Sequence, residues 1–365
     1  MSVVDYRRAL HRIPELDDQL PETVRLVREL LAPLPCQVLS PIQGSVCAWF
    51  DAGRAETAAF RADLDALPIQ EATALPYASI HPSRMHACGH DGHAAMVLAL
   101  GEYAAQRLAE LPRNLLLIFQ PSEETTGGAA RLCETGVLER YGVGRIFGLH
   151  LWPGLEAGAV ASRPGPLMAC SSEVTVTITG RSVHLSRAEE GLDALAAGVS
   201  YVRRVYRAAA RLPPEHIHVL RFGRMRSGSV RNALSGETRL EGSLRTFRAD
   251  TLPLCRRLLL DAGRAVEAES GCAVSVEFSG GYPAVWNHEA LYRRVAAQLD
   301  PPPLPLEAPV LAAEDFSFYQ QRVPGLFFLL GTGDTPQLHA PDFAFDDEAV
   351  LPAGAAFLAR LLMLP

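Results

Sequence analysis

The stretch MHACGHDGHAAM at residues 85–96 concentrates side chains that bind metals. It holds three histidines, a cysteine and an aspartate around two glycines, and an apolar run follows at once. Cys88 and His90 are two residues apart and cannot share a face of a regular helix. In a bent loop both could face one ion, and thiolate and imidazole suit zinc and related ions. The alternative is a polar loop in which Asp91 caps a helix.

A second candidate is FQPSEE at residues 119–124. Adjacent carboxylates at the end of a buried strand are costly unless something positive neutralises them. One of them could bind a metal while its neighbour acts as general base on metal-bound water. Alternatively, Ser122, Glu123 and Glu124 open a helix and interact favourably with its dipole.

Two histidines stand apart from these clusters. His150 ends the apolar run in GLHLWP, and His339 lies in the loop-like stretch QLHAPDF. In isolation each is typical of a structural residue. Because several independent segments offer metal-compatible side chains, a metal site is the better interpretation of the whole set.

A sheet must bring these segments together. The first 165 residues alternate between helix-like stretches, at 21–31 and 94–108, and the strand-like runs TAAFRADLDALPI, NLLLIFQP and IFGLHLWP. This alternation predicts an α/β fold, a largely parallel sheet with helices on both faces. Ligands gather beyond the carboxyl ends of such strands. The polar residues that follow these runs are Asp63, Asp65, Glu123, Glu124 and His150.

The pattern changes near residue 170. SSEVTVTITG alternates with period two, as expected for a half-solvated strand. A helix-like stretch at 192–212, two strand-like runs, a helix at 252–268 and the strand-like CAVSVEFSG complete a βαββαβ order. We expect an inserted α+β domain at 170–277 within a catalytic domain made of 1–169 and 278–365.

Composition narrows the possible functions. The 365-residue chain has a net charge of −7 and no basic tract, which argues against nucleic acid as a partner. It contains no lysine, so Schiff-base chemistry and a P-loop lysine are excluded. The N-terminus lacks the apolar stretch of a signal peptide, no run could span a membrane, and the seven cysteines are scattered. These features predict a soluble cytoplasmic protein.

Several motifs together resemble the metal-dependent M20 peptidase family. They are HRIPEL (11–16), RADLDALPI (61–69), MHACGHDGHAAM (85–96), FQPSEE (119–124), GLHLWP (148–153), AEDFSFY (313–319) and LHAPDF (338–343). Within the family the chain is similar to the amidohydrolase branch of hippurate hydrolases, auxin-conjugate hydrolases and N-acyl-amino-acid deacylases. The resemblance implies a mixed, mostly parallel-sheet catalytic domain of the zinc-aminopeptidase type with an inserted lid domain.

The resemblance also implies roles for individual residues. Glu123 becomes the general base, and Asp65 takes the position that usually orients a metal ligand. Asp63, His86 and His93 are expected to be structural. The implied ligands of two divalent ions per chain, zinc, manganese, cobalt or nickel, are Cys88 as the bridge, His90, Glu124, His150 and His339.

In the inserted domain, His184 falls on a histidine that the family uses to polarise the substrate carbonyl. The resemblance implicates Asn232 in binding substrate. Arg245 also matches a lid position, although an ion pair within the small domain is an equally good interpretation. The resemblance further implies a homodimer formed through the lid. Leu185, Ala188 and Ser235 depart from the family pattern, which leaves the specificity pocket open.

These features predict metal-dependent hydrolysis of the amide bond of an N-acyl amino acid, with Glu123 activating metal-bound water. Other functions on the same fold are a dipeptidase, an acyltransferase or amide-forming enzyme, and a non-catalytic binding protein. Dipeptidase relatives in the family more typically carry histidine and aspartate where this chain has RADLDALPI and HACGHD, so the resemblance favours N-acyl substrates over dipeptides.

Overall fold

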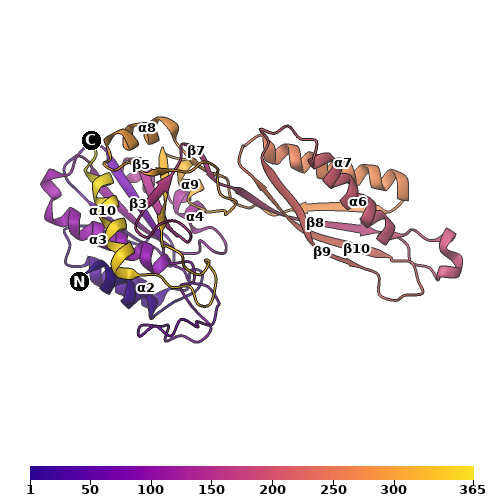
Figure 1. The fold of residues 1–365 in the computed structure, drawn as a ribbon, viewed down its shortest axis with the longest axis horizontal. Coiled ribbons are helices and arrows are strands. Elements are labelled where there is room, and N and C mark those ends of the chain that lie inside the picture. The colour runs from indigo at the N-terminus through magenta and orange to yellow at the C-terminus, as the bar shows by residue number, and fades with distance from the viewer. The chain divides into compact units, whose positions relative to one another are not determined.

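Two units share the chain in the computed structural model, which describes all 365 residues (Figure 1). The first unit comprises Met1–Leu167, Val285–Pro309 and Glu314–Pro365. The second comprises Met168–Ala284 together with Val310–Ala313. The chain therefore enters the second unit at Met168 and returns to the first at Val285. It then adds one short segment, Val310–Ala313, to the second unit before it ends in the first.

An eight-stranded sheet forms the centre of the first unit, in the order β1-β2-β4-β3-β5-β14-β6-β13. β3 runs parallel to β4 and to β5, and β5 runs parallel to β14. The strands are β1 (Gln37–Leu39), β2 (Val46–Phe50), β3 (Thr57–Asp63), β4 (Asn114–Gln120), β5 (Val143–Trp152), β6 (Val160–Ser162), β13 (Leu304–Pro305) and β14 (Gly325–Gly331). β7 (Gly165–Met168) and β12 (Val285–Asn287) pair separately.

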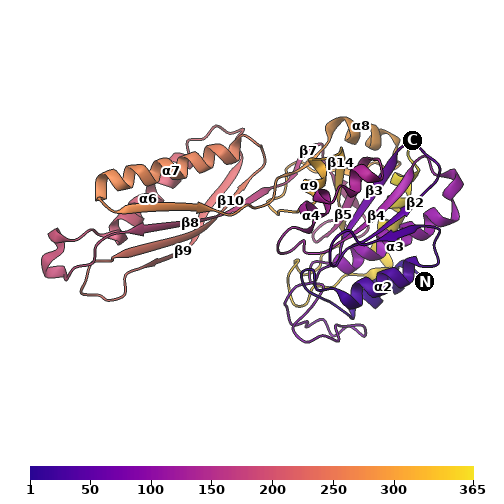
Figure 2. The same ribbon diagram turned by 180° about the vertical axis from the view of Figure 1, so that it is seen from behind.

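Helices cover this sheet (Figure 2). Every residue of β3, β4 and β14 is buried, which requires cover on both faces. The central helix α3 packs against β3, α1 and α10. The helices are α1 (Val3–His11), α2 (Pro21–Leu31), α3 (His90–Gln106), α4 (Gly128–Glu134), α5 (Val137–Arg140), α8 (Glu289–Gln298), α9 (Ser317–Gln320) and α10 (Asp347–Met363), with a 3-10 turn at Leu108–Glu110.

The second unit is an antiparallel sheet in the order β11-β8-β10-β9, with two long helices on one face. Its elements are β8 (Cys170–Thr179), a 3-10 helix (Leu185–Glu190), α6 (Ala194–Ala209), β9 (His218–Ser227), β10 (Glu237–Thr246), α7 (Thr251–Ser270) and β11 (Ala273–Phe278). Val174, Val176 and Ile178 of β8 pack with Tyr201 of α6 and Leu259 of α7. The expected βαββαβ order and α/β class are confirmed.

One helix differs from its predicted bounds in a way that affects the candidate site. A helix is expected at 94–108, but α3 begins at His90 and ends at Gln106. The apolar periodicity starts only after His93, so it does not reveal the first turn, which is polar and buried. No helix in the molecule has the length and apolar character needed to cross a membrane.

Candidate metal centre

The polar residues that follow the parallel strands meet at one edge of the large sheet. Asp63 ends β3, Gln120 ends β4, and His150 lies near the end of β5. β3 pairs with both β4 and β5, so these ends are adjacent. Parallel strands place their carboxyl ends on the same side, as the alternating sequence pattern predicts.

A left-handed glycine turns the chain into α3 between two of the expected ligands. Gly89 is the N-cap residue with φ of 83°, Cys88 precedes it, and His90 is the first helical residue. A Cβ on Gly89 would lie 2.7 Å from Cδ1 of Leu151. Glycine is needed here both for the backbone conformation and for the close approach of β5. His90 therefore belongs to the helix itself and only Cys88 to the loop before it.

Two groups of donor atoms share a single cysteine. The first group is Cys88, His90 and His150, and the second is Cys88, Glu124 and His339. In each group the donor atoms lie within 4.8 Å of one another. Within the first group, Sγ of Cys88 is 3.5 Å from Nε2 of His150. Within the second, Nε2 of His339 is 3.1 Å from Oε1 of Glu124.

Backbone carbonyls orient two of the imidazoles. Nδ1 of His90 lies 2.8 Å from the carbonyl oxygen of Asp65, and Nδ1 of His150 lies 2.7 Å from that of Leu151. A carbonyl oxygen can only accept, so each Nδ1 carries a proton and each Nε2 is the nitrogen left for a cation. Nε2 of His90 is buried and makes no hydrogen bond. Oε1 of Glu124 lies 3.1 Å from Nε2 of His339 and 3.8 Å from Nε2 of His90. The orphaned nitrogen of His90 and the thiol, imidazole and carboxylate donors fit divalent cations.

The protonation of the ligands follows from burial and from the neighbouring carboxylates. Burial lowers the pKa of His90, but Asp63, Asp65 and Glu124 outweigh it and raise the pKa to about 10. Burial, followed by Glu124 and Glu123, raises the pKa of the Cys88 thiol well above its usual range. His90 and the Cys88 thiol therefore carry protons when cations are absent, and protons and cations compete for the same lone pairs on these two residues.

His150 differs from His90 in its surroundings. Burial, assisted by the nearby His93, lowers the pKa of His150 to about 3. A neutral imidazole with an unprotonated Nε2 is the form that binds a cation. Unlike His90, His150 therefore does not have to lose a proton before it can bind a cation.

Asp65 organises the turn that carries the two glutamates. Its Oδ1 accepts the backbone N–H of Glu123 at 3.0 Å and its Oδ2 that of Glu124 at 3.1 Å. Residues 122–127 form a turn with Ser122 at φ of 60°, and the next helix begins only at Gly128. The alternative in which residues 122–124 open a helix is therefore wrong. The turn is held by an aspartate that lies 58 residues earlier.

The histidines expected to be structural have different surroundings. His93 contacts Oδ1 of Asp63 through Nδ1 at 2.6 Å, and its Nε2 accepts the N–H of Leu151 at 2.9 Å. Both of its nitrogens are engaged, so His93 has no lone pair left for a metal. His86 is buried and neither ring nitrogen has a hydrogen-bond partner. Burial lowers the pKa of His86 to about 3.

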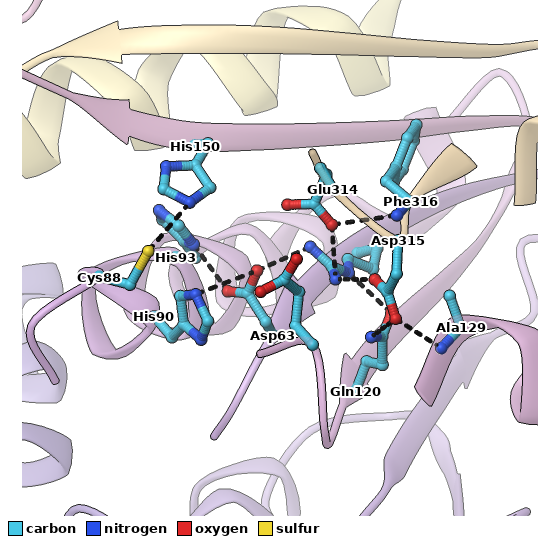
Figure 3. A network of polar contacts seen from close by, with 12 residues as sticks. Asp63, Cys88, His90, His93, Gln120, Ala129, His150, Glu314, Asp315 and Phe316 are labelled. Carbon is cyan, nitrogen blue, oxygen red and sulfur yellow. Dashed lines mark hydrogen bonds and ion pairs between the residues drawn. The ribbon is translucent and has the colours of Figure 1, made fainter. Parts of the chain in front are cut away.

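Sequence reasoning missed a buried arginine next to this centre. Arg61 forms ion pairs with Asp63, Glu314 and Asp315, and Figure 3 shows Glu314 and Asp315 on one side of Asp63 and the histidines on the other. The carboxylate oxygens of Glu123, Glu314 and Asp315 lie within 4.8 Å of one another. Two features of the sequence could have indicated this cluster: the lone arginine in the apolar run TAAFRAD and the acidic pair in AEDF.

The remaining candidates belong to the second unit. His184 and Asn232 are exposed and lie on neighbouring segments, since the carbonyl oxygen of Asn232 accepts the N–H of Leu185 at 3.1 Å. Arg245 lies on β10 with its Nη1 3.8 Å from Oε1 of Glu173, an ion pair within that unit. The alternative interpretation of Arg245 therefore has a partner in the structure.

Comparison with known proteins gives a consistent result. The sequence profile of peptidase family M20/M25/M40 matches residues 59–364. An N-acetyldiaminopimelate deacetylase from Lacticaseibacillus paracasei is 34% identical over 376 residues, covering 97% of this chain and 96% of the relative. The N-acetylcysteine deacetylase of Bacillus subtilis is 32% identical over 371 residues, covering 97% and 94%. A solved dinuclear metal-binding peptidase from Bacillus subtilis superimposes with a TM-score of 0.87 at 30% identity, covering 99% of this chain and 96% of that one.

Proposed function

The chain belongs to peptidase family M20/M25/M40, and on that basis we propose that it is a metal-dependent amidohydrolase of N-acyl amino acids. Hydrolysis of the amide bond releases a carboxylic acid and a free amino acid. Two relatives of nearly the same length are named as deacetylases of acetylated amino acids, which supports this substrate class. The acyl group and the amino-acid side chain are left open.

The shared cysteine is the observation that carries the proposal. Because Cys88 belongs to both donor groups, it would help to hold both cations, one with His90 and His150 and the other with Glu124 and His339. A mixture of sulfur, nitrogen and oxygen donors suits zinc, manganese, cobalt or nickel. When bound, such ions supply Lewis-acid chemistry, acidifying water and polarising the amide carbonyl.

Glu123 is proposed as the general base. It is buried beside Glu124 and His90, with oxygen and nitrogen donor atoms within 4.8 Å of one another. Burial, then Glu314 and Glu124, raise the pKa of Glu123 well above its usual range. A carboxylate with a raised pKa accepts a proton from the attacking water and returns it to the leaving amine at neutral pH. Removing this transfer costs about 10²- to 10⁴-fold in rate.

The proposed roles of the second unit rest on the sequence motifs. His184 would polarise the substrate carbonyl, and Asn232 would bind substrate. Arg245 is retained as a substrate-binding candidate despite its ion pair with Glu173. A homodimer formed through this unit and a cytoplasmic location are part of the same proposal.

A panel of N-acyl amino acids tests the proposed function. Purified protein reconstituted with zinc or manganese is incubated with acetyl, benzoyl and longer acyl derivatives of several amino acids, and the released amino acid is quantified. Glu123→Gln should keep its metal and lose about 10²- to 10⁴-fold in kcat. Glu29→Gln, an exposed change on α2, is the matched control. A metal-loaded wild type that releases no amino acid, or a Glu123→Gln variant with the wild-type rate, contradicts the proposal.

A further inference from the structure

Arg61 is a single buried cation surrounded by carboxylates. Its Nη1 lies 2.7 Å from Asp63, and its Nη2 lies 2.7 Å from Asp315 and 3.0 Å from Glu314. Its Nε donates to Oε1 of Gln120 at 2.8 Å. The arginine and its three acidic partners are all buried. Buried charges are tolerated only when paired, so this cation stabilises every carboxylate that can reach it.

Glu123 lies at the border between this cluster and the metal ligands. Its carboxylate is within 4.8 Å of Glu314 and Asp315 on one side and belongs to a group with Glu124 and His90 on the other. An arginine–carboxylate pair is short, charge-assisted and often bidentate. A glutamate captured by Arg61 would point away from the ligands, and its affinity for a proton would fall.

We propose that Glu314 is a positioning residue that occupies Arg61 and so keeps the Glu123 carboxylate directed toward Glu124 and His90. The inference rests on the proposed role of Glu123 as general base and deepens it. Three observations support it. Glu314 is held in place because its Oε1 also accepts the backbone N–H of Phe316 at 3.0 Å.

The other two observations concern charge. Glu314 shares Nη2 of Arg61 with Asp315, so that arm of the guanidinium is fully occupied. The carboxylates of Glu314 and Asp315 each place an oxygen within 4.8 Å of the Glu123 carboxylate, so their negative charges repel an ionised Glu123. This repulsion disfavours movement of an ionised Glu123 into the cluster.

Glu314→Gln tests the proposal with little change in shape. The amide oxygen can still accept from Phe316, but Arg61 loses one negative partner and Glu123 can replace it. We expect kcat to fall about 10- to 100-fold while KM stays within about threefold and metal content is unchanged. Glu314→Asp keeps the charge and should recover most of the lost kcat. A loss of folding alone would affect KM, metal content and kcat together.

Tyr319→Phe is the matched control within the same network. Its hydroxyl donates to Oε1 of Gln120 at 3.0 Å, so the change removes a buried hydrogen bond without changing charge. We expect kcat within about twofold of wild type, because this tyrosine does not compete with Glu123 for Arg61. A Tyr319→Phe variant as slow as Glu314→Gln would overturn the positioning role.

Crystal structures of the zinc-loaded wild type and Glu314→Gln provide a readout that does not depend on activity. In the variant, we expect the Glu123 carboxylate within about 3 Å of the Arg61 guanidinium, and in the wild type turned away from it. An unmoved Glu123 in the variant overturns the proposal. If the wild type hydrolyses no N-acyl amino acid, the proposed function fails, and the two structures still decide whether Glu314 positions Glu123.

Discussion

The carboxylate of Asp65 accepts the backbone N–H of Glu123 at 3.0 Å, and the carbonyl of the same aspartate lies 2.8 Å from Nδ1 of His90. One residue on the loop after β3 therefore contacts both the candidate metal ligand His90 at the start of α3 and the turn after β4. The family resemblance implies that Asp65 orients a metal ligand. In the structure the backbone carbonyl does this, and the side chain holds the glutamate turn.

Asp65→Asn should weaken metal binding. The amide that replaces one carboxylate oxygen cannot accept an N–H, so either Glu123 or Glu124 loses its backbone partner. Changes at groups that orient metal ligands cost about 10- to 100-fold in affinity. Competition with a chromophoric chelator measures the affinity for zinc.

Asp51→Asn is the control for this change. Asp51 is exposed, and its Oδ1 accepts the N–H of Gly53 at 2.9 Å away from the candidate site. Its zinc affinity should equal that of the wild type. Equal affinities in all three proteins would show that the Asp65 side chain does not support the ligands.

Gly89→Ala should disturb both the fold and the ligands. The residue has φ of 83°, and the new Cβ would lie 2.7 Å from Leu151. A left-handed alanine costs about 1–2 kcal/mol, and the clash adds to it while separating Cys88 from His90. Gly53→Ala isolates the first cost, since Gly53 has φ of 70° and open space around it. Urea unfolding measures how much unfolding free energy each variant loses relative to wild type. If Gly89→Ala and Gly53→Ala lose the same amount, the clash with Leu151 contributes nothing.

His86 should make the metal-free protein sensitive to acid. Its pKa is about 3 when folded because of burial, against about 6.5 when unfolded. Between these values the unfolded chain binds a proton that the folded chain does not, so the free energy of unfolding falls as pH falls. This histidine alone contributes about 1.4 kcal/mol per pH unit in that window. His150, with a pKa lowered to about 3, acts in the same direction.

His86→Leu should therefore reduce the slope of unfolding free energy against pH by about one proton between pH 4 and 6. Urea titrations in the presence of a chelator measure the slope. If the variant and the wild type have the same slope, His86 binds its proton equally well in both states and its burial does not exclude the charge.

Metal binding should release protons. His90, with a pKa raised to about 10, and Cys88, whose pKa is raised well above its usual range, both carry protons at pH 7 when no cation is bound. Cations that displace these protons should bind more tightly as pH rises. Calorimetry in two buffers of different ionisation enthalpy counts the protons released on zinc addition. A count of zero would contradict the assignment of these two ligands.

Much of this arrangement could be predicted from sequence. Alternating apolar runs identified β3, β4 and β5, and the rule that parallel strands share a carboxyl edge predicted that Asp63 and His150 lie at the same edge of the sheet. Period-two alternation predicted the half-exposed strand β8. These inferences succeed because periodicity and strand direction are local properties of the chain.

Other features depend on long-range packing and could not be read in this way. The start of α3 at His90 is set by Gly89 and by β5 against it, which no local periodicity encodes. The ion pair between Arg61 and Glu314 joins residues 253 positions apart, and neither segment contains a sequence pattern that identifies the other as its partner. Unpaired charges in apolar runs were the available signal, and they pointed to a buried partner without identifying it.

Metal content measured by elemental analysis tests the central claim most directly. Wild type, Cys88→Ala and Cys133→Ala, a second buried cysteine on α4, are reconstituted with zinc, passed over a desalting column and assayed on the same N-acyl amino acids. The account predicts about two ions per chain in wild type and Cys133→Ala, and the loss of both bound metal and hydrolysis in Cys88→Ala, because Cys88 belongs to both donor groups. A wild type that retains no zinc, or a Cys88→Ala variant that keeps two ions and full activity, would contradict it.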